Sequence, residues 1–555
     1  MFSAESSPNG SQPPDPHVRA NATTSLLTTD EDSYGVNASN APRRHGNSPD
    51  QNREGTNGQR PRSISALSES FMRGNSHKLP KQIGWMSLCV VCYFNVCGGP
   101  WGAEQIISSA GPLPGILGLF AFTTLWGLPI SMITAELSTT FADDGGYSIW
   151  VAEAFGPFWG FQEAYWSWIS GVIDTAVYPV LAYTTAIQVI TGKWSQPIDP
   201  SSRLLTPDIC VEPNSNNTLL GENVEIRWGE EYLIKLVLVF LFAVPNLVST
   251  NTLGRHLSLL AFFVAMPFIV QCVYLIVVRY DTLDFSILLE TRPNLQVGDW
   301  AKWVSILYWN FSGFDGVSTC AGEVHEPDKS YPKALFIGVI LVLCTYAIPL
   351  TILTAANKPE WICWDEGWFS VIALHEVGKW MAIWIVLASF AGNAGMYSAE
   401  IFEDSWQLCG MARAGLMPQV FGKRYNGNGT PYVAIWFGLG VIAALIALDF
   451  NDIVVSTNLF NVFSVELEML AFLKLRITQP EIARPYTLPI QNIRLLSLYL
   501  LIPISIGCIV IFSSAFTSLL TLGINFFLLV VGFCLYGQLS HNGSISYGGV
   551  SAEQT

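Results

Sequence analysis

The sequence predicts an all-α protein that crosses a membrane many times, and three observations support this prediction. Half of the 555 residues are apolar, and the mean hydropathy is positive. Only 13% of the residues are charged, whereas roughly 25% is usual in soluble proteins. Apolar runs of about 20 residues or more recur along the chain, which is the length that a helix needs to cross a bilayer.

Twelve apolar runs have the length of a membrane span. The first, third and sixth runs are longer than a bilayer requires, which predicts a tilt or a break in each of them. Residues 1–80 are rich in Ser, Asn, Gly and Pro and are predicted to be a disordered cytoplasmic tail. The predicted spans are 83–111, 113–139, 157–191, 231–250, 254–279, 298–323, 332–356, 377–401, 431–449, 452–475, 494–516 and 518–538.

Basic residues in the connectors predict the orientation of the chain. The connectors on the side of the N-terminus hold more lysine and arginine than those on the other side, so both termini are predicted to be cytoplasmic, including residues 539–555. The loop at 192–230 then lies outside, where Asn216 begins an Asn-Asn-Thr acceptor for glycosylation. Cys210 and Cys363 would lie outside too, either joined by a disulfide or as separate thiols.

Two of the runs are interrupted by small residues at corresponding places. The first run is broken at Gly98–Gly102, and the sixth is broken at Asn310–Gly316. These runs begin two successive sets of five spans, and matched interruptions are typical of a transporter whose substrate site lies near the midplane. Gly98, Gly99 and Asn310 are therefore predicted to line a binding site. The alternative is a packing device, because glycines also let membrane helices approach closely.

Three carboxylates lie within the predicted spans. An ionisable residue within a span is energetically costly and is a functional candidate by default. Asp174 lies in the middle of the third run, with Tyr178 one turn further on the same face. Asp315 lies in the second break, and Glu104 lies in the first turn after the first break. The alternative roles are structural: Asp174 would fix helix packing, and the other two would cap half-helices.

Glu104 bears on the chemistry of the cargo. The exposed amides at a helix start bind anions, and a carboxylate of the protein would offset their positive field. A site built in this way should repel a carboxylate and attract an ammonium. Trp101, Tyr178 and Trp309 would offer aromatic faces to such a cation, although most aromatic residues of a membrane core serve packing.

Several motifs of the chain, between residues 83 and 536, occur in the order of a known family. They read GGPWGAE, MITAELSTTFADDGGYSIWVAEAFGPFWGFQEAYWSWISGVIDTAVYPVL, YWNFSGFDGVSTCAGEVHEPDKSYPKAL, SWQLCGMARAGLMPQVFGKRYNGNGTPYVAI, ELEMLAFLKLRITQPEIARPYTLP and GFCLY. With these motifs the chain resembles eukaryotic polyamine uptake transporters of the amino acid–polyamine–organocation superfamily. The resemblance implies two inverted five-helix repeats, at 81–280 and 281–476, with broken helices 1 and 6 and with helices 11 and 12 at 477–538.

The resemblance also implies a function. It implies import of a small cationic polyamine, of the putrescine, cadaverine or spermidine type, by alternating access in the plasma membrane. The fifth span contains no lysine, unlike relatives that place an amine there, so we hypothesise coupling to protons through Asp174 or Glu104, with Glu468 as a further candidate. The alternatives are a cationic or neutral amino acid permease and a nutrient sensor that does not transport.

Other functional classes are not predicted. No nucleophile–base set or phosphate-binding loop occurs, so the sequence does not predict an enzyme. The cysteines are scattered and do not form a set of two CxxC motifs, so no metal site is expected. No cofactor and no nucleic-acid partner is expected either, and the oligomeric state is not predicted.

Overall fold

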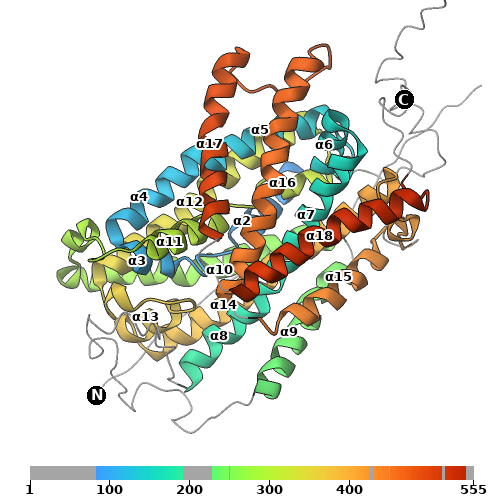
Figure 1. The fold of residues 1–555 in the computed structure, drawn as a ribbon. Helices are drawn as coiled ribbons and strands as arrows, with labels where there is room; N and C mark the ends of the chain where they lie inside the picture. Colours follow the sequence, from blue (N-terminus) through green and yellow to red (C-terminus); the bar gives the residue numbers. More distant parts are fainter. Residues whose placement is uncertain are drawn as a thin grey trace, which may run out of the picture. The chain divides into compact units, whose positions relative to one another are not determined.

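The computed structural model describes residues 83–191, 228–248, 250–425, 429–448, 450–514 and 519–545. Within these ranges the chain is helical, and its β-type pairings are two isolated bridges, Ile83 with Val324 and Asp144 with Cys320 (Figure 1). The predicted all-α class is therefore confirmed for the described part of the chain. The predicted tail at 1–80, Asn216 and Cys210 lie outside the described residues.

Proline residues begin several of the helices. Pro112, Pro157 and Pro327 each occupy the first helical position, where the missing amide hydrogen costs no hydrogen bond. The helices of the first half are α2 (Trp85–Val96), α3 (Glu104–Ala110), α4 (Pro112–Phe122), the π-helical turn η1 (Thr123–Gly127), α5 (Leu128–Thr140), α6 (Tyr147–Phe155), α7 (Pro157–Thr175), α8 (Val177–Thr191), α9 (Trp228–Val248) and α10 (Thr250–Val278).

The second half contains short 3₁₀ turns between longer helices. They are, in order, η2 (Tyr280–Thr282), η3 (Phe285–Leu289), α11 (Val297–Asn310), η4 (Gly316–Thr319), η5 (Ala321–Glu323), α12 (Pro327–Ala356), η6 (Trp361–Cys363), α13 (Phe369–Glu376), α14 (Lys379–Arg413), η7 (Gln419–Gly422), α15 (Tyr432–Leu445), α16 (Phe450–Thr478), α17 (Ile493–Ser513) and α18 (Leu519–His541).

Seven helical segments of the described chain are long and apolar enough to cross a membrane. Two further apolar helices, α2 and α15, are shorter. The count of twelve spans therefore stays a prediction. The seven segments are Pro112–Thr140, Gly254–Val278, Pro327–Ala356, Lys379–Arg413, Phe450–Thr478, Ile493–Ser513 and Thr521–His541.

Both predicted breaks are present. α2 ends at Val96, and the chain passes through Gly98 with a φ of 52° before α3 begins at Glu104. α11 ends at Asn310 and is followed by Gly313, with a φ of 94°. These are left-handed values that glycine adopts without strain. The second break differs from the first because only the short turns η4 and η5 follow it, instead of a helix.

The two breaks lie against each other. A Cβ atom on Gly313 would lie 2.6 Å from the backbone oxygen of Asn95, in the last turn of α2. A glycine at this position therefore allows the backbones of the two broken spans to touch. Around them, α2 packs against α12, α10 and α14, and α7 packs against α16 and α14 (Figure 1).

Two predicted spans have different bounds in the structure. The third run is not one helix, because α7 ends at Thr175 and α8 begins at Val177, so Asp174 lies in the last turn of α7. The eighth span was predicted to end at 401, but α14 continues to Arg413. This extension keeps two further acidic residues, Glu403 and Asp404, within the helix.

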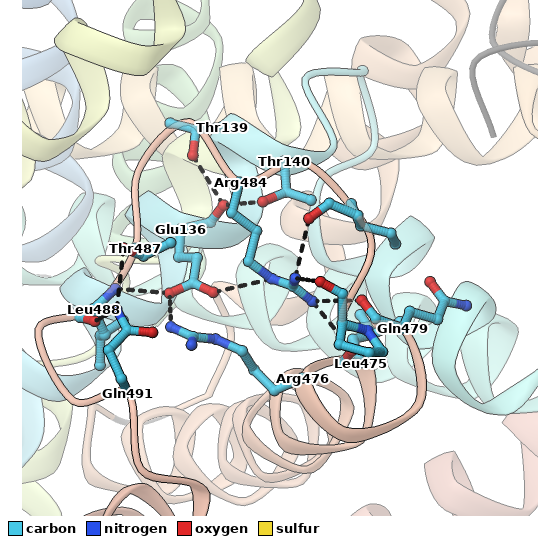
Figure 2. A network of polar contacts seen from close by, with 12 residues as sticks. Glu136, Thr139, Thr140, Leu475, Arg476, Gln479, Arg484, Thr487, Leu488 and Gln491 are labelled. Carbon is cyan, nitrogen blue, oxygen red and sulfur yellow. Dashed lines mark hydrogen bonds and ion pairs between the residues drawn. The ribbon is translucent and has the colours of Figure 1, made fainter. Parts of the chain in front are cut away.

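A buried ion-pair network joins the end of α5 to the segment between α16 and α17. Glu136 of α5 is fully buried, and its Oε2 lies 2.5 Å from Arg476 Nη2 and accepts a hydrogen bond from the Leu488 amide at 2.8 Å. Arg484 Nε lies 3.4 Å from Glu136 Oε1, and its guanidinium also donates to backbone carbonyls such as that of Leu475. Figure 2 shows both arginines approaching the one carboxylate from different directions.

A second ion-pair network holds the segment that follows the second break. Arg424 Nη2 lies 2.9 Å from Asp144 Oδ2, and Arg424 Nη1 lies 3.4 Å from Glu323 Oε1. Arg413 also pairs with Asp144, at 3.0 Å. The Arg424 guanidinium lies over the ring of Trp406, 4.2 Å from its centroid. These contacts join η5 to the connector between α5 and α6 and to the end of α14.

Candidate functional site

A pocket lies where the two breaks meet α7, α14 and α16. It contains about 360 Å³ of empty space, part of it open to solvent. Four of its lining residues are carboxylic acids, and no lysine, arginine or histidine is among the described residues that line it. The lining residues are Asn95, Ser167, Ser170, Gly171, Asp174, Ser312, Gly313, Asp315, Glu400, Glu403, Thr457 and Asn461.

Asp174 is held by two aromatic side chains that the sequence analysis also selected. Trp309 Nε1 donates to Asp174 Oδ1 at 2.6 Å, and the Tyr178 hydroxyl donates to Asp174 Oδ2 at 2.9 Å. A Cβ atom on Gly102 would lie 2.6 Å from the Trp309 ring, so the glycine of the first break makes room for this tryptophan. The structure thus brings Asp174, Tyr178 and Trp309 together at the pocket.

Asp315 begins a series of polar contacts that leads away from the pocket. The carboxyl groups of Asp315 and Glu468 are both buried and lie beside each other. The Ser464 hydroxyl lies 3.5 Å from Glu468 Oε1 and donates to Glu163 Oε1 at 2.7 Å. Glu163 is fully buried in α7. Glu466, two residues before Glu468, instead faces Gly507 of α17.

The helix α14 contributes acids that the sequence analysis did not select. Glu403 accepts from Asn95 Nδ2 at 2.6 Å and from the Tyr147 hydroxyl at 3.1 Å. Gly316 lies so close to Glu403 that a Cβ atom there would collide with its carboxylate. Glu400 lines the same pocket. The signal in the sequence was the spacing of Glu400, Glu403 and Asp404, since residues three and four apart share one helix face.

Glu104 does not line the pocket. It begins α3 and is fully buried; its Oε1 accepts a hydrogen bond from the Phe369 amide at 3.3 Å, whereas its Oε2 has no hydrogen-bond partner in the described part of the chain. Its carboxylate turns towards the start of α13 and is not part of the pocket lining. Trp101 is also absent from the pocket lining, since its Nε1 donates to the Gly98 carbonyl and its ring packs on Phe268 and Phe369.

The other predicted residues in the described part of the chain lie outside the pocket lining. Asn310 is buried, and its Nδ2 donates to the Ile306 carbonyl one turn earlier in α11. Gly98 and Gly99 form the first break without lining the pocket.

Cys363 is disulfide-bonded, but its predicted partner Cys210 lies outside the described residues, so that pairing stays a prediction.

Beside α3, a separate acidic pair lies in the loop before α13. Gln105 donates to Asp365 and, at 2.8 Å, to Glu366 Oε2. Burial and the adjacent Asp365 raise the pKa of Glu366 well above its usual value. Burial opposes ionisation of Asp365 too, yet hydrogen bonds from Glu366 and Gln105 and the charge of Lys302 lower its pKa. The pair therefore holds a proton on Glu366 and a charge on Asp365.

The fold and the pocket define a class of protein. Helices long and apolar enough to cross a bilayer enclose a polar pocket, and irregular backbone from two broken helices meets there. Non-helical backbone is tolerated at membrane depth where it lines a cavity or is buried in protein. This is the arrangement of a transporter that carries a small solute across a multi-pass membrane domain.

Comparison with known proteins identifies the family. A family model described as amino acid permease matches residues 83–541, and the chain belongs to this family. A probable polyamine transporter of Arabidopsis thaliana is 33% identical over 462 residues, 83% of this chain and 84% of that protein. The polyamine transporter RMV1 of the same plant is 33% identical over 82% of this chain and 85% of its own.

A relative from a second plant is similar to the same degree. The polyamine transporter PUT1 of Oryza sativa subsp. japonica is 33% identical over 413 residues, which are 74% of this chain and 70% of that protein. The resemblance predicted from the motifs is thereby confirmed. The protein is a membrane transporter and not an enzyme.

Proposed function

We propose that the protein imports linear polyamines by alternating access and couples their movement to protons. The observation that carries this proposal is the pocket itself, which is lined by Asp174, Asp315, Glu400 and Glu403 without a basic residue among its described lining. Carboxylates buried in a membrane need a counter-ion. A cargo with two or more ammonium groups supplies that charge, whereas an amino acid would bring a carboxylate of its own.

The proposal includes the finer architecture predicted from the sequence. The chain would cross the plasma membrane twelve times, with repeats at 81–280 and 281–476 and two further helices at 477–538. With cytoplasmic termini, the ion pairs of Asp144, Glu323 and Arg424 would lie on the cytoplasmic side and hold it closed. The pocket would then be reached from outside, or be occluded, in this conformation.

Proton coupling is proposed to run through Asp315 and Glu468. Asp315 lines the pocket, while Glu468 lies behind it and is linked through Ser464 to Glu163. An ammonium that binds near Asp315 would compete for its charge and displace a proton held by the two adjacent carboxyl groups. Asp174, the other predicted coupling residue in the pocket, would act mainly as a cation acceptor.

Uptake by the purified full chain in proteoliposomes tests this function. We expect labelled putrescine to accumulate when the outside is more acidic than the inside, and a protonophore to abolish the accumulation. Unlabelled spermidine should compete, whereas leucine should not. Absence of amine uptake would refute the transport function, and uptake that ignores the pH gradient would refute the coupling.

A pair of matched variants separates coupling from transport. We expect Glu468→Gln to bind putrescine but to lose the response to the pH gradient. Glu466→Gln makes the same change two residues away, on the side of α16 that faces Gly507, and should respond as the unmodified protein does. An unchanged gradient response in Glu468→Gln would remove Glu468 from the coupling path.

A further inference from the structure

The four carboxylates of the pocket differ in how far the protein already satisfies them. Asp174 accepts hydrogen bonds on both oxygens, from Trp309 and Tyr178. Glu403 also accepts on both oxygens, from Asn95 and Tyr147. Asp315 lies beside the carboxyl group of Glu468. Each of these three acids therefore has a polar side chain of the protein beside it.

Glu400 is different. Its side chain is only 6% exposed and lines the pocket, yet no residue in the described ranges of the chain donates a hydrogen bond to its carboxylate or forms an ion pair with it. Asp174, Asp315, Glu403 and Asp404 all lie within electrostatic range of it. A charged carboxylate in this setting is repelled by its neighbours and has lost most of its water. It consequently has the strongest need of a cation in the pocket.

The geometry points to Glu400 as the residue that binds a terminal ammonium of the cargo directly, with Asp174 as a second acceptor. This inference rests on the proposed transport function. A primary ammonium presents three N–H donors in a compact group, and each carboxylate oxygen can accept more than one hydrogen bond. Glu400 offers two unoccupied oxygens, and Asp174 retains free lone pairs beside the donors that orient it.

The surrounding residues fit an ammonium group. Ser170 of α7 and Thr457 of α16 line the pocket and are already bonded to each other through the Ser170 hydroxyl and the Thr457 carbonyl, at 3.0 Å. They fix the distance between the two helices beside Asp174. Glu400 comes from a third helix, α14, so an ammonium bound between Glu400 and Asp174 would join α14 to α7.

Equilibrium binding of labelled putrescine to the purified full chain tests the inference. Replacement of the carboxylate in Glu400→Gln keeps the shape of the side chain but removes its charge. We expect the dissociation constant to rise about 10- to 100-fold, as for the loss of one charged hydrogen-bonded contact. Glu400→Asp should lose less, because it keeps the charge. Glu466→Gln is the matched control and should bind as the unmodified protein does.

The outcomes separate the inference from the function on which it rests. If the unmodified protein binds no polyamine, the proposed function fails. If it binds putrescine and Glu400→Gln binds it equally well, only the assignment of Glu400 fails, and Glu400 then carries a proton instead of contacting the cargo. If sodium ions compete with putrescine for the unmodified protein but not for Glu400→Gln, the subsite takes a metal cation and the ammonium assignment is overturned.

A second measurement on the unmodified protein does not depend on whether the variant folds. Carbodiimides react with carboxyl groups in apolar surroundings, and mass spectrometry locates the modified residue. Because putrescine is a primary amine, we expect a bound molecule to form an amide with the activated carboxyl group of Glu400, the carbodiimide leaving as its urea, and no such amide to form at Glu466. Modification of Glu400 by the carbodiimide without any putrescine amide would contradict the inference.

Discussion

Replacing Glu136 by alanine should destabilise the protein far more than the same replacement in an exposed ion pair. Glu136 is fully buried, and Arg476 and Arg484 expose only 10% of their side chains. Without Glu136, the Arg476 guanidinium loses its carboxylate and the Leu488 amide loses its acceptor, while Arg484 keeps its bonds to backbone carbonyls. Removing one partner of a buried pair costs about 3 to 5 kcal/mol.

The control for this experiment is Glu326→Ala. Glu326 pairs with Lys329 at 3.1 Å, but the two side chains are 53% and 72% exposed, so the loss should be about 0 to 1 kcal/mol. The free energy of unfolding of both variants would be measured by denaturant titration in detergent micelles, followed by tryptophan fluorescence. If Glu136→Ala costs no more than Glu326→Ala, the network of Figure 2 does not anchor the segment between α16 and α17.

Two further predictions concern a glycine and a titrating acid. Gly313→Ala should lower the free energy of unfolding by about 1 to 3 kcal/mol and reduce uptake, because a side chain at a φ of 94° would collide with Asn95. Gly537→Ala is the control: a Cβ atom there would have no neighbour within 4 Å, so neither stability nor uptake should fall. Burial raises the pKa of Glu376 to about 7 from a model-peptide value of 4.5. The folded state then binds the extra proton, so stability should fall as pH rises from about 4.5 to 7, by about 1 to 2 kcal/mol after allowance for solvent screening. Glu376→Gln should lack this component, and identical pH profiles of the two proteins would contradict the assignment.

The breaks of the first and sixth spans could be predicted because they depend on local chemistry. Gly98 and Gly313 both adopt left-handed φ values, and glycine is the residue type that adopts them without strain. The geometry after the second break could not be predicted, because Gly316–Thr319 forms a tight turn whose course depends on the close contact with Glu403 of a distant helix. That contact is tertiary and leaves no local pattern in the sequence.

The sequence predicted contacts of the site only where both residues lie in the same span. Asp174 and Tyr178 lie one turn apart, and the helical repeat alone placed them together. Glu400 was missed because the predicted eighth span ended beside it, so an acid that lines the pocket was placed at a membrane boundary. Glu104 was selected from its place after the break, but helix geometry does not reveal that its carboxylate turns towards Phe369.

The described pocket lining contains no basic residue, and this affects the rate at which the empty carrier can reorient. If the protein carries polyamines as proposed, the bound ammonium groups offset part of the negative charge of the pocket, and reorientation with cargo moves less net charge through the bilayer than reorientation without it. After release, the same acids must take up protons or another cation before the carrier can return, since bare charges at that depth are costly. The empty return step would then be the slow half of the cycle. A polyamine waiting on the release side would shorten it, so counterflow should outpace net import.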